Sequence, residues 1–360
     1  MEIDDARNSL LSREDLERRG TTVQMLRASL ARGDLHRVDH GRYVEMTLWR
    51  SRYVEGRHLL RVVAAAERQR GTSLVFSHAS AAVMHGLPLF RMEPARVHLS
   101  GSAANGQVLA CKPTVARHEV PVPDEDIVEI GGISCTSLPR AVAEVVRSAP
   151  RETGIAVLDA ALRRGAWCDR SRTYDVDRAE TLRAQIGRYL PKGGRGVRRG
   201  REILMLGDGR IESPGESVSH LYLRDIGFPP PLLQAQVPGP GGTTYYVDFE
   251  LDGAFGEFDG MGKYIDPVLR GGRGIEEVVV AEKRREDWIR GMTGKRVVRW
   301  GTADIADAAT FEQRLARFGL TPRGRAGGTG SARRATHPFS PIPHSFIDPS
   351  ADSAQSGEGS

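Results

Sequence analysis

The chain has 360 residues, of which 39% are hydrophobic and 27% are charged, and its formal net charge is +5 at pH 7. These values are typical of a soluble globular protein with two or three domains, and the excess of basic residues mildly favours a polyanionic partner. No apolar run reaches the length of a membrane span, and the polar start Met1-Glu-Ile-Asp-Asp5 is unlike a signal peptide. We therefore expect a cytoplasmic protein without a membrane partner.

Residues 1–50 carry the signals of a small helical unit that ends in a β-hairpin. Ser12 and Asp15 have the spacing of a capping box, which predicts the start of a first helix. A second helix follows a glycine turn and ends at Gly33, and an Asp-His-Gly turn at 39–41 then separates two short strands. Helix, turn, helix and hairpin in this order predict a winged helix-turn-helix.

The second of these helices and the hairpin carry side chains that suit DNA. Gln24, Arg27 and Arg32 lie on the helix, where they can enter a major groove and bind base edges. Arg37 and Arg42 flank the hairpin turn, where they can contact phosphates or a minor groove. The alternative is that these are solvated residues of a small helical bundle, or that the unit mediates protein contacts.

The central part of the chain is harder to interpret. Residues 51–165 are predicted to form a mixed α/β domain, and residues 166–200 a basic connector that either tracks a DNA backbone or acts as a flexible linker. His78 and His85 lie seven residues apart on one helix face, too far for the usual pair of metal ligands at i and i+4. We interpret both as packing and capping residues. The three cysteines, Cys111, Cys135 and Cys168, are scattered, which argues against disulfides and against a zinc site, and we expect buried structural thiols.

Residues 201–320 are predicted to fold in the order α-β-β-β-α-β, from the alternation of helical and strand patterns. Residues 321–360 are rich in Gly, Ser, Arg and Pro and contain few large apolar groups. Such a segment cannot bury enough surface to offset the entropy of ordering, so we expect a disordered tail.

Acidic residues in this third region suggest a metal site. Glu216 lies near a helix start, Asp248 in one strand, and Glu257 and Asp259 on the same face of the next strand. Carboxylates brought together repel one another unless a cation neutralises them, and Mg²⁺ prefers such oxygen ligands. We expect Asp248 and Glu257 to hold Mg²⁺, Glu216 to assist, and Asp259 or Lys263 to tune an attacking water. The alternative is that Asp248 and Asp259 are ordinary solvated residues.

Four segments of this region resemble the very-short-patch-repair-endonuclease-like domain of the PD-(D/E)xK nuclease superfamily. The resemblance implies a restriction-endonuclease-like α/β/α fold of three layers, with Asp248 and Glu257 as metal ligands. At the position of the superfamily's usual lysine, two residues after the glutamate, this chain has Asp259. The matching segments are Glu212-Ser-Pro-Gly-Glu216-Ser217, Tyr246-Val-Asp248-Phe249, Glu257-Phe-Asp259-Gly260 and Lys283-Arg-Arg285 with Arg296-Val-Val-Arg-Trp300.

The first 165 residues are similar to the AbiEi-type antitoxin family. The resemblance implies a winged-helix domain that reads operator DNA, followed by a second α/β domain, with a cognate toxin as a further possible partner. Its motifs include Arg32-Gly-Asp-Leu-His-Arg-Val38, Ser77-His-Ala-Ser-Ala-Ala82 and Thr136-Ser-Leu-Pro-Arg140.

Two functions are therefore expected from the sequence. The first is a DNA-binding protein with a Mg²⁺-dependent endonuclease-like domain that acts on DNA phosphodiester bonds in defence or repair. The alternative is a non-catalytic AbiEi-type antitoxin or transcriptional repressor that carries an inactive nuclease fold.

Overall fold

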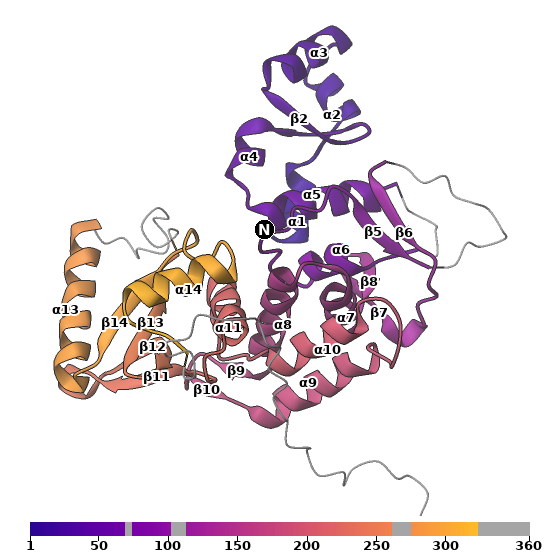
Figure 1. Ribbon diagram of the computed structural model, residues 1–360. Helices are drawn as coiled ribbons and strands as arrows, with labels where there is room; N and C mark the ends of the chain where they lie inside the picture. The colour runs from indigo at the N-terminus through magenta and orange to yellow at the C-terminus, as the bar shows by residue number, and fades with distance from the viewer. Residues whose placement is uncertain (69–73, 102–112, 261–274, 323–360) are drawn as a thin grey trace, which may run out of the picture. The chain divides into compact units, whose positions relative to one another are not determined.

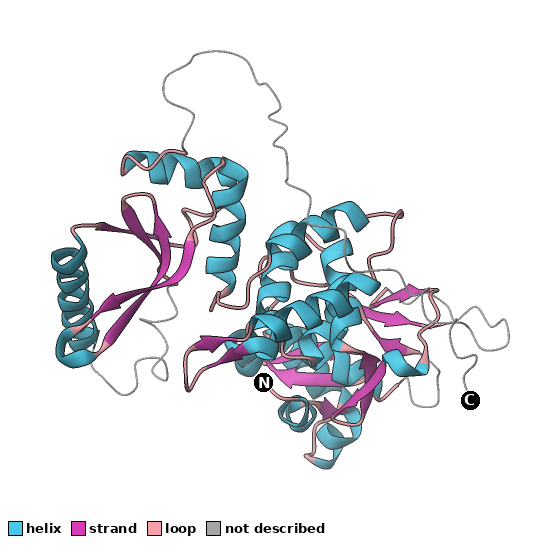
Figure 2. Ribbon diagram, turned by 90° about the horizontal axis from the view of Figure 1, so that it is seen from below, coloured by secondary structure: helices cyan, strands magenta, loops and turns pink. Residues whose placement is uncertain are grey.

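The computed structural model describes residues 1–68, 74–101, 113–260 and 275–322, which form mixed α/β structure with four β-sheets (Figures 1 and 2). Cys111, Lys263 and the predicted tail beyond Pro322 lie outside these residues. Within them, no helix has both the length and the apolar character needed to cross a membrane. Cys135 is buried as predicted, whereas Cys168 is exposed, so the prediction of a buried thiol is wrong at that position.

The N-terminal region, residues 1–50, alternates helices with short strands. Its three strands form one antiparallel sheet with β3 in the centre. The sequence predicts the helices that follow Ser12 and Thr22 and the hairpin, but not the helix over residues 3–9 or the strand at residues 11–12. The elements are α1 (Ile3–Ser9), β1 (Leu11–Ser12), α2 (Arg13–Arg18), α3 (Val23–Arg32), β2 (Leu35–Asp39) and β3 (Arg42–Glu45), followed by α4 (Met46–Ser51).

Local capping explains where these helices begin and end. The Ser12 hydroxyl accepts a hydrogen bond from the Asp15 amide at 3.0 Å, and the Asp15 carboxylate accepts one from the Ser12 amide at 2.8 Å. This is the predicted capping box of α2. Thr22 caps α3, and Gly33 ends it with a φ of 78°, a conformation that costs glycine little.

The middle region holds a five-stranded sheet of mixed direction in the order β6-β5-β4-β8-β7. Strand β5 is antiparallel to β4 and parallel to β6, so residues from distant parts of the chain meet along these strands. The elements are α5 (Val54–Ala66), β4 (Val75–Phe76), α6 (His78–Met84), β5 (Val97–Ser100), β6 (Val115–His118), β7 (Ile127–Ile130), β8 (Ile133–Thr136), α7 (Leu138–Ser148) and α8 (Arg151–Ala166).

Residues 166–200, predicted to be a basic connector, contain regular structure. A two-stranded hairpin, β9 (Trp167–Cys168) with β10 (Thr173–Tyr174), precedes α9 (Val176–Arg188), and α10 (Val197–Leu206) begins inside the basic segment. The segment packs against α7: a Cβ on Gly196, whose φ is 77°, would lie 2.1 Å from the Arg147 carbonyl oxygen. Only glycine fits there without backbone movement, so this part of the segment is a packed helix start and not a flexible linker.

The C-terminal region follows the predicted order α-β-β-β-α-β. Its sheet runs β11-β12-β13-β14, with β13 and β14 parallel and the other neighbours antiparallel. Trp300 and Phe311 pack on one sheet face with α11, and Phe255 and Ile289 pack on the other with α13, which gives three layers. The elements are α11 (Pro214–Ile226), β11 (Leu232–Pro238), β12 (Thr244–Leu251), β13 (Ala254–Phe258), α13 (Ile275–Thr293), β14 (Arg296–Trp300) and α14 (Ala308–Arg317).

Two buried histidines make the fold sensitive to acid. His58 in α5 and His220 in α11 are 0% and 8% exposed. Burial lowers the pKa of His58 to about 3 and that of His220 to about 4. Because these values lie below that of an unfolded histidine, about 6.5, the stability present above that pH is lost as the pH falls towards the folded-state pKa.

We expect the melting temperature to fall between about pH 7 and about pH 5, and His220→Leu to reduce this fall. Leucine cannot take up a proton, and the buried Nδ1 of His220 has no hydrogen-bond partner among the described residues. The variant should keep about 1–2 kcal/mol of the stability that the natural chain loses at the lower pH. Thermal unfolding followed by circular dichroism at both pH values measures this. His40→Leu, at an exposed turn, is the control, and an equal loss in all three proteins would contradict the prediction.

Candidate functional site

A pocket of about 350 Å³ is lined by residues of strands β11, β12 and β13 together with residues from other parts of the chain. The ladder pairs Leu233 with Phe249 and Ala235 with Val247, which places Gln234 opposite Asp248. Gln234 has a φ of 51°, in the left-handed region that residues other than glycine rarely adopt. Strained backbone of this kind concentrates at functional sites. The pocket is lined by Arg172, Glu212, Gln234, Thr244, Tyr245, Tyr246, Asp248, Glu257, Phe258, Asp259, Glu282, Arg285 and Arg299.

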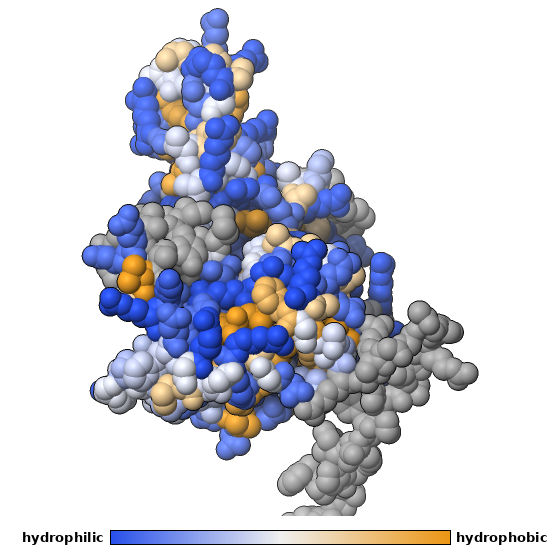
Figure 3. All heavy atoms as spheres, turned by 60° about the vertical axis from the view of Figure 1, so that its left-hand side comes forward, coloured by the Kyte–Doolittle hydropathy of each residue, from blue (hydrophilic) through white to orange (hydrophobic). Residues whose placement is uncertain are grey.

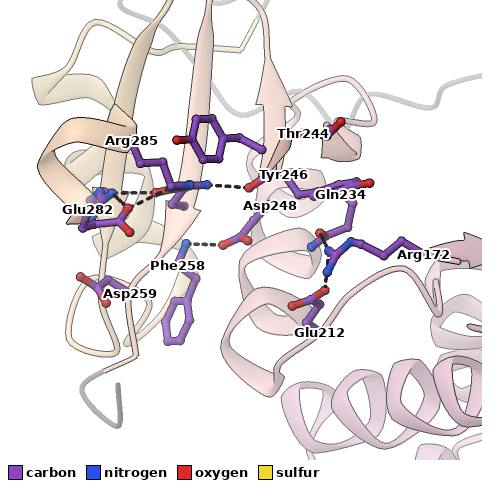
Figure 4. Close-up of a pocket in the computed structure, with 13 residues that line it drawn as sticks. Arg172, Glu212, Gln234, Thr244, Tyr246, Asp248, Phe258, Asp259, Glu282 and Arg285 are labelled. Carbon is purple, nitrogen blue, oxygen red and sulfur yellow. Dashed lines mark hydrogen bonds and ion pairs between the residues drawn. The ribbon is translucent and has the colours of Figure 1, made fainter. Parts of the chain in front are cut away.

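Three of the predicted acidic residues meet in this pocket. Asp248 comes from β12, Glu257 from β13, and Asp259 follows β13 directly (Figure 4). The Asp248 Oδ2 accepts a hydrogen bond from the Phe258 amide at 2.8 Å, which fixes the carboxylate between the two strands. The Asp259 amide donates to the Trp300 carbonyl at 2.8 Å and extends the pairing of β13 with β14.

Glu257 is held by two arginines. Its Oε1 lies 2.7 Å from Arg285 of α13, and its Oε2 lies 3.0 Å from Arg299 of β14. Glu257 is only 9% exposed, so a carboxylate there needs a positive partner to offset its lost hydration. Two guanidinium groups satisfy both of its oxygens with charge-assisted hydrogen bonds or ion pairs.

Glu282 of α13 completes this charged cluster. It accepts a hydrogen bond from Arg285 at 2.8 Å and also contacts Arg299. Burial alone would raise the pKa of Glu282, but the charges of Arg285 and Arg299 together with their hydrogen bonds hold it below its usual value. Desolvation lowers the pKa of Arg285, but its hydrogen bonds and ion pairs with Glu257 and Glu282 outweigh that effect and raise the pKa. Glu282 and Arg285 are therefore charged at neutral pH.

Glu216 faces its own helix start. Its Oε2 accepts a hydrogen bond from the Glu212 amide at 2.9 Å, and its Oε1 accepts one from the Ser213 hydroxyl at 2.7 Å. The neighbouring Gly215 lets the helix approach β13, since a Cβ there would lie 2.0 Å from the ring of Phe258. The Ser-Pro-Gly-Glu sequence therefore has a structural reason in capping and close packing, and Glu216 is not among the pocket-lining residues.

The arginines around Glu257 weigh against Mg²⁺ at this carboxylate. An ion on Glu257 would have to compete with two guanidinium groups that already occupy both carboxylate oxygens. Among the described residues, the three-residue group whose ligand atoms lie within 4.8 Å of one another consists of histidines from the middle region, not of these carboxylates. Mg²⁺ binding by Asp248 and Glu257 stays a prediction, and Lys263 lies outside the described residues.

Several pocket residues were not predicted as site residues. Arg285 and Arg299 belong to the segments that carry the nuclease resemblance, so that resemblance contained the signal for them. Arg172 had no such signal, since it lies in the predicted connector. Its guanidinium stacks over the Tyr246 ring at 4.0 Å and contacts Glu212 at 3.2 Å (Figure 4). Only the tertiary fold brings it to the pocket.

The predicted DNA-contacting residues divide into two groups. Gln24 and Arg27 on α3 are exposed, and the described part of the chain offers their side chains no hydrogen bond or ion pair. The other three have partners within the protein. Arg32 pairs with Asp34 at 2.8 Å, Arg37 lies 2.9 Å from the Nδ1 of His40, and Arg42 forms a half-buried ion pair with Glu67, which directly follows α5.

No family model matches the chain. Two uncharacterised proteins of Mycobacterium tuberculosis, MT2308 of strain CDC 1551 / Oshkosh and Rv2248 of strain ATCC 25618 / H37Rv, are each 36% identical to it over 120 residues, or 33% of this chain. The match spans 40% of the length of each relative, so it covers less than half of either protein. Neither name states an activity.

Among solved structures, the chain is similar to the RV2827C protein from Mycobacterium tuberculosis. The alignment covers 66% of this chain and 87% of that protein, with 12% sequence identity and a TM-score of 0.32. A likeness this weak carries no argument about fold or function.

Proposed function

We propose that this chain is a DNA-binding regulator of the AbiEi antitoxin type, which reads double-stranded DNA through its N-terminal region. The observation that carries the proposal is the order of elements there: α1-β1-α2-α3-β2-β3, with the strands arranged β1-β3-β2. A helix-turn-helix followed by a two-stranded wing presents its second helix to the major groove. In this chain that helix is α3.

The surface of α3 supports this role. Leu26 and Leu30 face the small core that also contains Leu16 and Tyr43, which leaves the opposite side of the helix to solvent. On that solvent-facing side, Val23 and Met25 can contact thymine methyl groups, while Gln24 and Arg27 can form hydrogen bonds with adenine and guanine. Figure 3, with the N-terminal region at the top, shows hydrophilic and apolar side chains side by side on its surface. The exposed apolar residues of α3 are Val23, at 46%, and Met25, at 54%.

The wing contributes less charge to DNA than its sequence suggests. Arg42 of β3 is paired with Glu67, which directly follows α5, and Arg32 is paired with Asp34 next to the end of α3. A phosphate could still replace Asp34 or His40 as the partner of Arg32 or Arg37, because these two arginines are exposed. In the proposed interface, α3 therefore contacts the bases, and few of these arginines contact phosphates.

A second candidate is hydrolysis of DNA phosphodiester bonds by the C-terminal region. One observation favours it: Asp248, Glu257 and Asp259 line a single pocket next to the strained Gln234. The ion pairs of Glu257 with Arg285 and Arg299 weigh against it. Binding to a cognate toxin likewise stays a prediction.

Selection from a random pool of DNA duplexes tests the proposed function. The full-length chain is incubated with the pool in the presence of a chelator, and bound duplexes are amplified and sequenced over several rounds. A DNA-reading protein enriches one shared sequence. If the bound duplexes share no sequence after selection, the proposal is overturned.

A further inference from the structure

Three histidines from three different elements meet in the middle region. His78 is the first residue of α6, His98 lies in β5, and His118 ends β6. The parallel pairing of β5 with β6 and the packing of α6 on the sheet bring them together although they are far apart in sequence. One ring nitrogen from each histidine lies within 4.8 Å of the others.

The ring nitrogens converge on one another. The Nδ1 of His98 lies 3.0 Å from the Nε2 of His118, close to the separation of about 3.3 Å between two nitrogens bound to one tetrahedral zinc ion. The ring of His78 stacks on that of His118, with centroids 3.8 Å apart and planes inclined by 14°. All three side chains are partly exposed, so an ion can reach them from solvent.

A second set of groups orients His78. The Glu144 Oε2 accepts a hydrogen bond from the His78 amide at 2.9 Å and lies 3.7 Å from its Nδ1, and the Ser77 hydroxyl is 3.1 Å from the same ring nitrogen. Carboxylates and hydroxyls in this position commonly fix the ring of a metal-binding histidine. Glu144 is itself held by Arg140 at 3.1 Å.

The backbone at His78 is strained. Its φ is 51°, which a residue other than glycine adopts at some energetic cost, and strain of this kind concentrates at functional sites.

His85 shows what a packing histidine looks like in the same helix region. Its Nε2 lies 2.8 Å from the Thr136 carbonyl oxygen and 4.0 Å from the Cys135 Sγ, both inside the core, as expected for a structural residue. The cluster differs, because the Nδ1 of His98 has the Nε2 of His118 as its partner at 3.0 Å, a ring nitrogen and not a backbone oxygen.

We propose that His78, His98 and His118 form a binding site for one divalent transition-metal ion, with zinc as the best match. Imidazole nitrogens suit Zn²⁺ and its neighbours in the first transition row, and they do not suit Mg²⁺ or Ca²⁺. Three protein ligands leave a fourth position on a tetrahedral ion. Water or a group from a partner can fill that position. The site is separate from the pocket of the C-terminal region and does not depend on the proposed function.

The test is zinc binding by the full-length chain after tag removal and dialysis against a chelator. Isothermal titration with ZnCl₂ should give one equivalent bound, and His98→Gln and His118→Gln should each weaken binding by about a hundredfold or more. His40→Gln, at an exposed histidine of the wing turn, is the matched control and should bind like the natural chain. Absence of stoichiometric zinc uptake, or unchanged uptake in the two cluster variants, overturns the proposal.

Cobalt substitution keeps the proposal testable if the variants do not fold. The natural chain loaded with one equivalent of Co²⁺ should show the intense visible absorption of a tetrahedral site with nitrogen ligands, and one equivalent of Zn²⁺ should remove it. A spectrum typical of hydrated, octahedral Co²⁺ would contradict the assignment, whatever the variants do.

Discussion

Replacing both Gln24 and Arg27 with alanine is expected to abolish sequence-specific DNA binding. Each side chain can form a bidentate contact with one base, worth about 1–3 kcal/mol, so together they should account for about a hundredfold or more in affinity. Folding should be unaffected, because the core side of α3 is formed by Leu26 and Leu30, which the substitutions leave in place. Fluorescence anisotropy on the selected duplex, with the single and double variants, measures the loss.

Arg50→Ala serves as the control for this experiment. Arg50 lies on α4 and is exposed. Its replacement by alanine removes the same charge from the N-terminal region as Arg27→Ala does. It should lower affinity for every duplex by a small and equal amount. If the double variant and Arg50→Ala bind the selected duplex equally well, α3 does not read DNA.

Glu257→Ala is expected to destabilise the C-terminal region by about 2–3 kcal/mol. The substitution removes one of the two carboxylates that both Arg285 and Arg299 contact and leaves them only Glu282 in common. Removing one partner of a buried pair costs about 3–5 kcal/mol, and the lower figure applies here because the two arginine side chains are 20% and 26% exposed. Urea unfolding of the natural chain and the variant gives the difference in free energy of unfolding.

Glu250→Ala is the matched control, on the neighbouring strand of the same sheet. Glu250 pairs with Lys295, but these side chains are 31% and 33% exposed, so the loss should not exceed about 1 kcal/mol. The same measurements with millimolar Mg²⁺ separate the two roles of Glu257. A structural glutamate predicts no effect of the ion on unfolding, whereas a metal ligand predicts stabilisation of the natural chain that Glu257→Ala abolishes.

The parts of the fold that follow from local signals could be predicted from the sequence. The capping box of Ser12 with Asp15 and the glycine at position 33 fix helix ends within a few residues of chain, and both are found in the structure. The order of elements in the C-terminal region was also predicted, because its strands and helices differ clearly in apolar period.

Helices α9 and α10 were missed for a physical reason. Ala179 and Ile186 are the buried residues of α9, so the apolar period of that helix is weak in a polar sequence. The glycines around α10 look like a linker, yet Gly196 is required by the close approach of the Arg147 carbonyl. That reason exists only in the tertiary structure.

The candidate site could be predicted in part. Asp248, Glu257 and Asp259 are close in sequence and on adjacent strands, and the structure places all three in one pocket. The partners that decide their chemistry, Arg285 and Arg299, come from a helix and a strand further along the chain. Neither their contacts with Glu257 nor the left-handed backbone at Gln234 has a sequence signal of its own.

The histidine cluster is the clearest case of information that only the fold supplies. The sequence pairs His78 with His85 on one predicted helix face, at a spacing that does not suit two ligands of one metal ion. The structure instead joins His78 to His98 and His118 through two parallel strands. No periodic pattern links residues on separate elements of this kind.

The central claim is that the chain binds DNA without cutting it. The most direct test incubates the full-length protein with supercoiled plasmid and with the selected duplex, in Mg²⁺, in Mn²⁺ and in chelator. We predict binding that is equal in the natural chain and in the Asp248→Ala/Glu257→Ala variant, provided that the variant is folded, with both DNAs left intact. Metal-dependent nicking or cutting by the natural chain that disappears in the folded variant would contradict this account and establish a nuclease.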